Sequence, residues 1–378
     1  MIRWFLFLLA LSVTAASSLT IFKAPTLFLW KVSVLTGEFG HLLIVVPLLV
    51  IWLAWYHGGK MGVPILILSL LAIGLLLRPV VQAAFMGPKL PGQLEKAFGR
   101  VELKRAPFSF ATLLQVMPEE AKARGMEFMR EGGKEPLALD FYPAAGRTTP
   151  APCVVVLHGG GWDNGDRSQL AAMNHHLAQC GYAVAAISYR LAPQNIWPAQ
   201  AEDIGAALEF LKQQARGLGI DPQNFVLMGR SAGGQLATAY AYGSLDPAVR
   251  GVISLYGPQD QVFAWQFSRE DDILNATKLL RQFLGGTPET AAESYTSASA
   301  YLIATRDSLP TLLVHGANDP LVWHKQSERM HELLDELGVP NAFVSLPWAT
   351  HAFDYNLYGP SGQLTSYSIE WFLAAVTK

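Results

Sequence analysis

The sequence predicts an α/β domain, with a mostly parallel sheet and helices on both faces, preceded by about three transmembrane helices. Three observations support this fold class. The first eighty residues contain long stretches without a charged side chain, and the residues beyond 124 alternate between short apolar runs and helical patterns. A Gly-x-Ser-x-Gly pattern also stands at 229–233, between an apolar run and a helical segment. We therefore divide the chain into a transmembrane region at 1–84, a linker and candidate cap segment at 85–123, and the α/β domain at 124–378.

Uncharged stretches at 4–22, 39–59 and 61–77 predict membrane spans at about residues 4–22, 39–57 and 61–78. Each reaches roughly 25–30 Å as a helix, near the thickness of the hydrocarbon layer. The second and third are separated only by "HGGK" at 57–60, which fits a tight helical hairpin. The first stretch has an alternative interpretation as a cleaved signal peptide, because it combines a basic start, an apolar core and small residues after it.

Lysine and arginine positions bear on the orientation of the chain, because positive residues prefer the cytoplasmic side of a membrane. With a cytoplasmic N-terminus, three spans would place Arg3 and Lys60 inside. The same arrangement would place a larger group outside: Lys23, Lys31, Arg78, Lys89 and Lys96. The count favours a cytoplasmic C-terminal domain, whereas a signal-like first span favours the outside.

Composition and motifs exclude several classes of partner. A formal net charge of −2 gives no electrostatic basis for binding nucleic acid. No Walker or dinucleotide-binding pattern occurs among the glycines, so we predict no cofactor. Adjacent His175 and His176 would point apart on a helix, so we predict no metal site. Cys153 and Cys180 fit small core residues better than a disulfide.

The α/β domain is predicted from eight apolar runs and the helical patterns between the later ones. The expected strands are 125–131, 137–143, 153–159, 182–190, 225–231, 251–257, 311–317 and 342–347. The expected helices are 168–180, 198–218, 233–243 and 324–338. Residues 259–300 interrupt this alternation, and we expect them to form an inserted helical element above the carboxyl ends of the strands. Residues 106–123 could fold over the same face.

A catalytic triad is predicted from residues that follow strands. Ser231 lies in the turn of the Gly-x-Ser-x-Gly pattern, and a serine hydroxyl needs a base that is oriented by a carboxylate. Asp319 and His351 each follow an expected strand, in the order that this topology requires. Among the other candidates, Asp307 precedes its strand and Asp354 follows His351. His315 shares the strand and loop of Asp319. Asp335, His324 and His331 lie on or beside a helix.

The glycine triplet in "VVVLHGGGW" predicts an oxyanion hole. Backbone N–H groups stabilise a developing negative charge when no side chain blocks their approach. Gly160 and Gly161 are the best candidates for this role, with Gly159 as a further one. Ala232 supplies the N–H next to the nucleophile.

Six motifs carry a resemblance to a known superfamily: "HGGGW" at 158–162, "SYRLAP" at 188–193, "PAQAEDI" at 198–204, "GRSAGG" at 229–234, "HGANDPLV" at 315–322 and "HAFD" at 351–354. Together they resemble the α/β-hydrolase superfamily, specifically hormone-sensitive-lipase-like and kynurenine-formamidase-like esterases. The resemblance covers about residues 120–378. It implies the same triad and oxyanion donors, and a structural pair of Arg190 and Asp203. Position 230 departs from the family, because an arginine stands where relatives usually carry Asp, Glu, Gln or His.

These observations predict a membrane-anchored serine hydrolase, most simply a carboxylesterase for a small-molecule or lipid-like ester. An acyltransferase, a peptidase on the same fold and a non-catalytic membrane scaffold remain as alternatives. Because the linker at 87–93 is expected to carry few contacts, the domain beyond residue 84 is expected to work without the spans.

Overall fold

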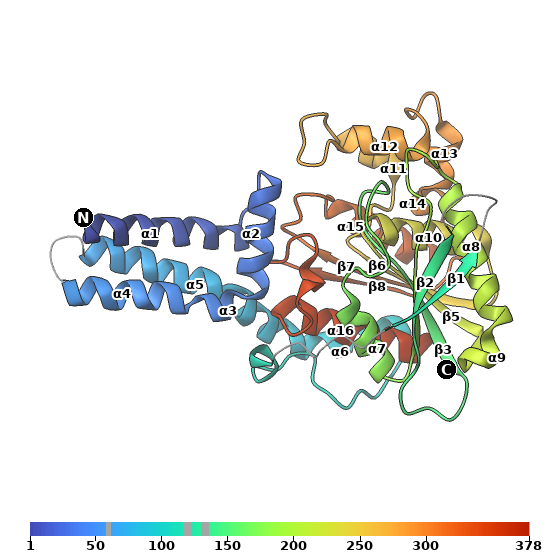
Figure 1. Cartoon of the computed structure of the whole chain (residues 1–378), viewed down its shortest axis with the longest axis horizontal. Coiled ribbons are helices and arrows are strands. Elements are labelled where there is room, and N and C mark those ends of the chain that lie inside the picture. The colour runs from blue at the N-terminus through green and yellow to red at the C-terminus, as the bar shows by residue number, and fades with distance from the viewer. Residues whose placement is uncertain (58–61, 116–122, 130–135, 378) are drawn as a thin grey trace.

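The computed structural model describes residues 1–57, 62–115, 123–129 and 136–377, and its N-terminal helices project as a rod from an α/β part (Figure 1). Three helical segments are long and apolar enough to cross a membrane: Ile2–Thr20, Gly40–His57 and Gly62–Phe98. The turn of the expected hairpin, at 58–61, lies outside the described residues.

Three helices form the rod, and a fourth lies across its end (Figure 1). Helices α1, α4 and α5 run side by side around a small apolar core that includes Leu6, Val50 and Ile65. Helix α2 turns across the end of the rod where the rod meets the α/β part. The N-terminal elements are α1 (Ile2–Ser17), η1 (Ser18–Thr20), α2 (Leu27–Glu38), α3 (Gly40–Leu43), α4 (Val45–His57), α5 (Gly62–Met86), η2 (Gly87–Lys89), α6 (Leu90–Phe98) and η3 (Thr112–Leu114).

The segment expected to be a linker, 87–93, is helical instead. Helix α5 continues to Met86, and α6 follows after a single 3₁₀ turn. Pro88 and Pro91 each stand in the first turn of a helix, where a missing N–H costs no hydrogen bond. Leu94 of α6 is fully buried in the core of the α/β part. The expectation of few contacts at this segment is therefore wrong, because its prolines start helices rather than mark a loop.

An eight-stranded sheet forms the centre of the α/β part, in the order β1-β2-β4-β3-β5-β6-β7-β8. The pairs β1–β2 and β2–β4 are antiparallel, and all the other neighbouring pairs are parallel. All eight expected strands are present: β1 (Arg124–Met129), β2 (Leu137–Tyr142), β3 (Ala151–Leu157), β4 (Ala183–Ile187), β5 (Ile220–Arg230), β6 (Val249–Leu255), β7 (Thr311–Gly316) and β8 (Asn341–Leu346).

Helices cover both faces of the sheet, as the continuous apolar runs predict. On β3, Val155 contributes to the core on one face and Val154 to the core on the other. Residues of α8, α10 and α15 pack into the first core, and residues of α6, α7 and α16 pack into the second. The helices are α7 (Ala171–Gln179), α8 (Ala199–Gln213), α9 (Ala215–Leu218), α10 (Ala232–Ser244), α11 (Gln261–Phe267), α12 (Ala276–Leu284), α13 (Ala292–Ser297), α14 (Ala300–Ile303), α15 (Lys325–Leu337) and α16 (Pro360–Val376), with η4 at Phe353–Tyr355.

Two segments were expected above the carboxyl ends of the strands, and the structure describes one of them in full. Helices α11 to α14 form the expected insertion, and residues of α11 and α12 line the cavity described below. The described part of the other segment, 106–115, lies with the preceding Arg105 along α16. There the Arg105 guanidinium binds the Glu370 carboxylate, and the Ser109 N–H donates to the Gln363 side chain. Residues 116–122 of the candidate cap lie outside the described part of the chain.

Candidate active site

Ser231 stands in a strained turn between β5 and α10. Its backbone has φ of 53° and ψ of −120°, a conformation that non-glycine residues rarely adopt. The two glycines of the motif let the strand and the helix approach closely, because a Cβ on Gly229 would lie 2.0 Å from the Gly233 carbonyl oxygen. The Ser231 N–H donates to the Leu255 carbonyl on the neighbouring strand. The sequence thus forces this serine out of the regular strand at the carboxyl edge of the sheet.

Asp319 and His351 meet at the same edge. The Nδ1 of His351 lies 2.6 Å from Oδ2 of Asp319. The other carboxylate oxygen accepts hydrogen bonds from the N–H groups of Leu321 and Val322. Burial alone would raise the pKa of the Asp319 carboxyl, but the adjacent His351 and His315 hold it below its ordinary value. The carboxylate therefore stays ionised and can orient an imidazole.

His315 is a second histidine on Asp319, and sequence reasoning treated it only as a competitor. Its Nε2 lies 3.2 Å from Asp319 Oδ2, and its Nδ1 lies 2.7 Å from the Ser327 hydroxyl. His324 and His331 contact β8 instead, through Ser345 and Asn341. The sequence did hold a signal for this contact, because His315 stands four residues before Asp319 at the end of the same strand.

The glycine loop presents two backbone amides to the cavity. Gly160 has φ of 128°, and a Cβ there would lie 2.1 Å from the Asn164 carbonyl oxygen, so only glycine fits. Within the described parts of the chain, the amides of Gly160 and Gly161 have no hydrogen-bond partner. The Gly159 amide differs, because it donates to the Gln169 side chain at 2.7 Å. Ala232 is the first residue of α10, where the N–H has no partner within its own helix.

A cavity of about 790 Å³ lies at this edge of the sheet. Ser231, Asp319 and His351 line it together with the glycine loop and the insertion. Three further lining residues come from the N-terminal region, between the first candidate span and the middle of α2: Lys23, Leu27 and Trp30. Sequence reasoning missed these three, because they stand far from every motif and within a segment that was assigned to the membrane.

The N-terminal segment also holds the loops that carry Asp319 and His351. The Trp30 indole N–H donates to the His351 carbonyl at 3.0 Å. The Asn318 side chain donates to the Thr20 carbonyl at 2.9 Å, one residue before Asp319. On the other side of His351, the Tyr256 ring lies 4.4 Å from the imidazole, measured between ring centroids. The N-terminal segment therefore holds the backbone of the His351 loop, and Tyr256 packs against the imidazole.

Two arginines that the motifs singled out have acidic partners. The Arg190 Nε lies 2.7 Å from Asp203 Oδ1, so the expected pair is present. Arg230, the departure from the family pattern, is fully buried and lies 2.5 Å from Asp354 of the "HAFD" motif. Burial alone would lower the pKa of Arg230, but Asp354 raises it. This ion pair joins the nucleophile strand to the loop that follows His351.

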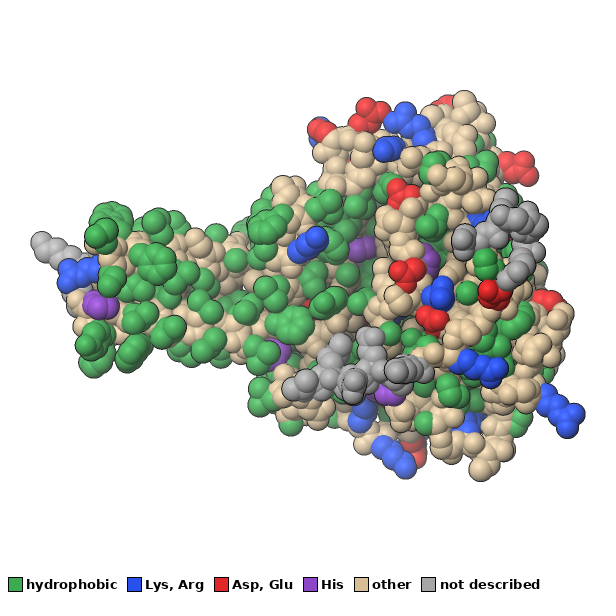
Figure 2. Space-filling view, viewed as in Figure 1, with side chains coloured by type: hydrophobic (Ala, Val, Ile, Leu, Met, Phe, Trp, Pro, Cys, Tyr) green, Lys and Arg blue, Asp and Glu red, His purple; other side chains and the backbone are tan. Residues whose placement is uncertain are grey.

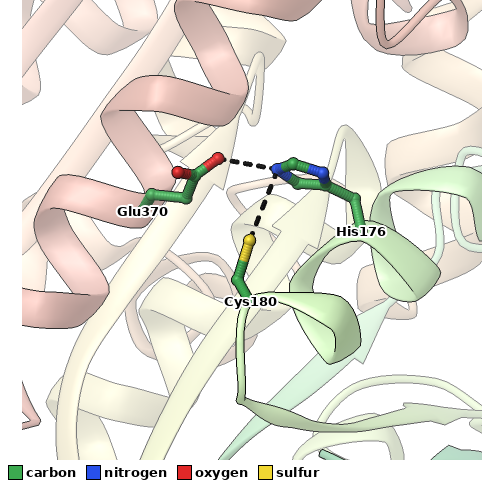
Figure 3. A group of neighbouring side chains, drawn as sticks. All are labelled: His176, Cys180 and Glu370. Carbon is green, nitrogen blue, oxygen red and sulfur yellow. Dashed lines mark hydrogen bonds and ion pairs between the residues drawn. The ribbon is translucent and has the colours of Figure 1, made fainter. Parts of the chain in front are cut away.

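A cluster of possible metal ligands lies outside the cavity, where His176 and Cys180 of the α7 end approach Glu370 of α16 (Figure 3). The His176 Nε2 is 2.6 Å from a Glu370 oxygen, and the Arg105 guanidinium binds both oxygens of the same carboxylate. Burial alone would lower the pKa of His176, but Cys180 and Glu370 raise it to about 9. Two cationic partners thus already neutralise Glu370, and the cluster works as an ion pair between two helices.

Comparisons with known proteins bear on the family to which the chain belongs. The sequence profile of the BD-FAE family matches residues 139–334, more than half of the chain. A probable carboxylic ester hydrolase of Mycobacterium tuberculosis, LipM, is 31% identical over 63% of this chain and 58% of its own length. Esterase LipC of the same organism is 28% identical over 61% of this chain and 59% of its own. The chain thus spans less than two thirds of the length of these relatives.

Solved structures resemble the fold. A bacterial heroin esterase superposes with a TM-score of 0.58 at 21% identity, over 80% of this chain and 98% of the other. Esterase 2 of Thermogutta terrifontis superposes with a TM-score of 0.55 at 22% identity, over 67% of this chain and 91% of the other. The profile match and the sheet topology together lead to one conclusion: the chain belongs to the BD-FAE family and has the α/β-hydrolase fold.

Proposed function

We propose that this chain is a membrane-anchored serine hydrolase that cleaves carboxylic esters through Ser231, His351 and Asp319. The observation that carries the proposal is the 2.6 Å contact between His351 Nδ1 and Asp319 Oδ2, in a cavity that Ser231 also lines. The strained backbone of Ser231 supports its role as the nucleophile.

In this mechanism Ser231 Oγ attacks the ester carbonyl carbon while His351 takes the hydroxyl proton. The amides of Gly160, Gly161 and Ala232 stabilise the negative charge that develops on the carbonyl oxygen. The alcohol leaves with the proton from His351, and an acyl group remains on Ser231. Water then attacks the acyl carbon with His351 as the base, which releases the acid and restores the serine.

Two further observations support the finer parts of the proposal. Relatives named as ester hydrolases favour an ester over an amide as the substrate. Three helices of sufficient length and hydropathy favour an anchor in the bilayer, and the positive-residue count supports a cytoplasmic side for the α/β part.

The full chain in detergent micelles tests the proposal with p-nitrophenyl butyrate as substrate and a fluorophosphonate as covalent probe. Ser231→Ala should abolish probe labelling and lower turnover by about 10⁴-fold or more, because the nucleophile is lost. Ser294→Ala on α13, outside the cavity lining, is the matched control and should behave like the wild type. Turnover that survives in Ser231→Ala would refute the assignment of the nucleophile.

The same assay separates the alternatives. Added alcohols that intercept the acyl group in preference to water would indicate an acyltransferase. Faster cleavage of an amide than of the matching ester would indicate a peptidase. A wild-type chain that is folded yet neither labelled nor active would indicate a scaffold without catalysis.

A further inference from the structure

The segment that runs from the end of the first candidate span into the first residues of α2 forms one wall of the cavity. Lys23, Leu27 and Trp30 from this segment line the same space as Ser231 and His351. The segment is fixed at its start, because the Thr20 carbonyl accepts hydrogen bonds from Arg78 of α5 and from the Asn318 side chain. The cavity wall is therefore continuous with the helices that are proposed to lie in the membrane.

This wall places the cavity at the end of the helical rod. Helix α2 lies across the end of the rod, beside the α/β part (Figure 1). Hydrophobic side chains continue from the rod onto this junction (Figure 2). If the rod spans a bilayer, the junction lies at the level of the lipid headgroups, where the hydrocarbon layer ends.

Large apolar side chains are exposed at residues that line the cavity or that directly neighbour its lining residues in the chain. Phe22 and Phe28 of the N-terminal segment are 64% and 72% exposed, and Phe267 of α11 is 60% exposed. Trp323, which follows Asp319 by four residues, is 43% exposed. Aromatic side chains are enriched at membrane–water interfaces, and clustered exposure of this kind marks a surface that meets an apolar phase. The rim of the cavity thus fits a bilayer surface better than bulk water.

Lys23 supplies a cation in the wall, and no group of the described residues neutralises it by direct contact. Within the described residues its ammonium group makes no hydrogen bond or salt bridge. Arg230, the other long cation of the wall, is paired with Asp354. The wall also holds three carboxylates: Asp319 is held by His351, Asp272 caps the start of α12, and Asp163 accepts a hydrogen bond from the Asn164 side chain. Lys23 is therefore available to bind an anionic group of a ligand.

The remainder of the wall suits an apolar chain. Leu27 and Trp30 face the cavity from the N-terminal segment, and Phe263 and Leu279 face it from α11 and α12. The cavity volume of about 790 Å³ lies in the upper part of the range for small-molecule sites, roughly 300–1,000 Å³. A largely apolar wall with one cation that makes no salt bridge among the described residues matches an amphiphile with a negative head.

We propose that the site takes amphiphilic esters with an anionic headgroup from the membrane surface, and that Lys23 binds the anionic group. This inference rests on the proposed function. The apolar rim receives the acyl chain from the bilayer, and the Lys23 ammonium holds the head so that the ester carbonyl lies beside Ser231. Lys23 is a specificity-determining residue in this scheme, and the bond-breaking steps remain those of Ser231 and His351.

The test uses the full chain reconstituted in phosphatidylcholine vesicles, a zwitterionic lipid that does not compete as an anion. Two fluorogenic esters with the same long acyl chain are compared, one with a carboxylate on the alcohol part and one with a neutral group of similar size. The readout is the ratio of kcat/KM for the anionic ester to kcat/KM for the neutral ester. We expect the wild type to favour the anionic ester by about tenfold, as one charge-assisted contact allows.

Three variants test whether Lys23 causes the preference for the anionic ester. Lys23→Gln should lower the ratio by about tenfold, mainly through KM, and Lys23→Arg should retain most of it because the charge is kept. Lys31→Gln is the matched control, since Lys31 is an exposed lysine on the same segment outside the cavity lining. An unchanged ratio in Lys23→Gln would overturn the inference, as would a wild type that cleaves both esters equally well.

A second arm identifies the source of the substrate. A short-chain, water-soluble ester with the same carboxylate is compared with the long-chain ester held in the vesicles. A higher kcat/KM for the vesicle-held ester supports delivery from the membrane, and a higher value for the soluble ester overturns that part. Failure of the proposed function would look different, because then neither ester would be cleaved and the fluorophosphonate would not label Ser231.

Discussion

The two sides of the cavity are held by different parts of the chain. On the nucleophile side, Ser231 and the Gly160 loop are fixed by the sheet and by close backbone approaches within the α/β part. On the side of the proposed base, hydrogen bonds of Asn318 and Trp30 hold the loops of Asp319 and His351 to the N-terminal segment. The difference teaches that a family motif can place the reactive groups while elements outside the family complete their support.

The Arg230–Asp354 pair joins the two sides, and breaking it should have the largest effect. Among the described residues, Arg230→Met would leave the buried Asp354 carboxylate with the Tyr256 hydroxyl as its one side-chain hydrogen-bond partner. An uncompensated buried charge should lower the free energy of unfolding by about 3–5 kcal/mol. Chemical denaturation of the full chain in micelles measures this loss.

The double variant Arg230→Met with Asp354→Asn is the control for that prediction. It removes both charges and keeps a polar group for Tyr256, so it should recover much of the lost stability. A single variant as stable as the wild type would mean that the two sides are not coupled through this pair.

Removing residues 1–84 tests whether the base side works alone. The sequence alone predicts a soluble, active domain, whereas the structure predicts a damaged one. The deletion removes Thr20, Trp30 and Glu38, all of which contact the loops around His351. Because small displacements of catalytic groups can cost about 100-fold, kcat/KM for p-nitrophenyl butyrate should fall by about that factor.

For the truncated domain, circular dichroism reports whether it is folded, and fluorophosphonate labelling reports whether Ser231 still reacts. A folded domain that still reacts slowly with the probe would agree with a misplaced base. A truncated domain with nearly wild-type kcat/KM would show that the nucleophile side and the base side do not need the N-terminal segment.

The sequence was most informative where local patterns decide the structure. All eight strands and the insertion were predicted, because buried strands read as apolar runs and the insertion breaks their rhythm. The contact between Asp319 and His351 agrees with the predicted triad, since both residues follow parallel strands that end at one edge.

The sequence was least informative where contacts join distant parts of the chain. Trp30 and His351 are 321 positions apart, and no periodicity relates them. A segment between two apolar stretches carries the pattern of a membrane loop, so its role as a cavity wall has no local signal. Pro88 and Pro91 fit either a loop or the first turn of a helix, and the sequence alone does not distinguish these two structures. The burial of Leu94 decides for the helix.

Glu38 ties the end of α2 to α16 and should make stability depend on pH. Its carboxylate oxygens accept hydrogen bonds from the Ser361 hydroxyl and N–H, and its side chain is buried. Burial raises the pKa of Glu38 from 4.5 to about 8. Between these two values the native state keeps a proton that the unfolded chain has lost, so stability should fall as pH rises, by up to about 1.4 kcal/mol per pH unit.

Glu38→Gln removes the titrating group and keeps an oxygen that can accept from Ser361. Denaturation midpoints of both proteins at pH 6 and pH 7 measure the slopes, and the variant should show the shallower one. Equal slopes would mean that the Glu38 carboxyl is ionised in the native state, and that α2 is held to α16 by other contacts.

The smallest expected effect comes from Trp30→Phe, which isolates one hydrogen bond of the base side. The variant keeps an aromatic ring near His351, where the two ring centroids lie 6.4 Å apart, and removes only the N–H that donates to the His351 carbonyl. Loss of one hydrogen bond of this kind is worth about 1 kcal/mol, so kcat for p-nitrophenyl butyrate should fall about fivefold. If Trp30 positions the base, KM should change less than kcat, and a fall confined to KM would show instead that the ring only shapes the pocket. Trp52→Phe on the exposed surface of α4 is the matched control, and an equal loss in both variants would remove Trp30 from the support of His351.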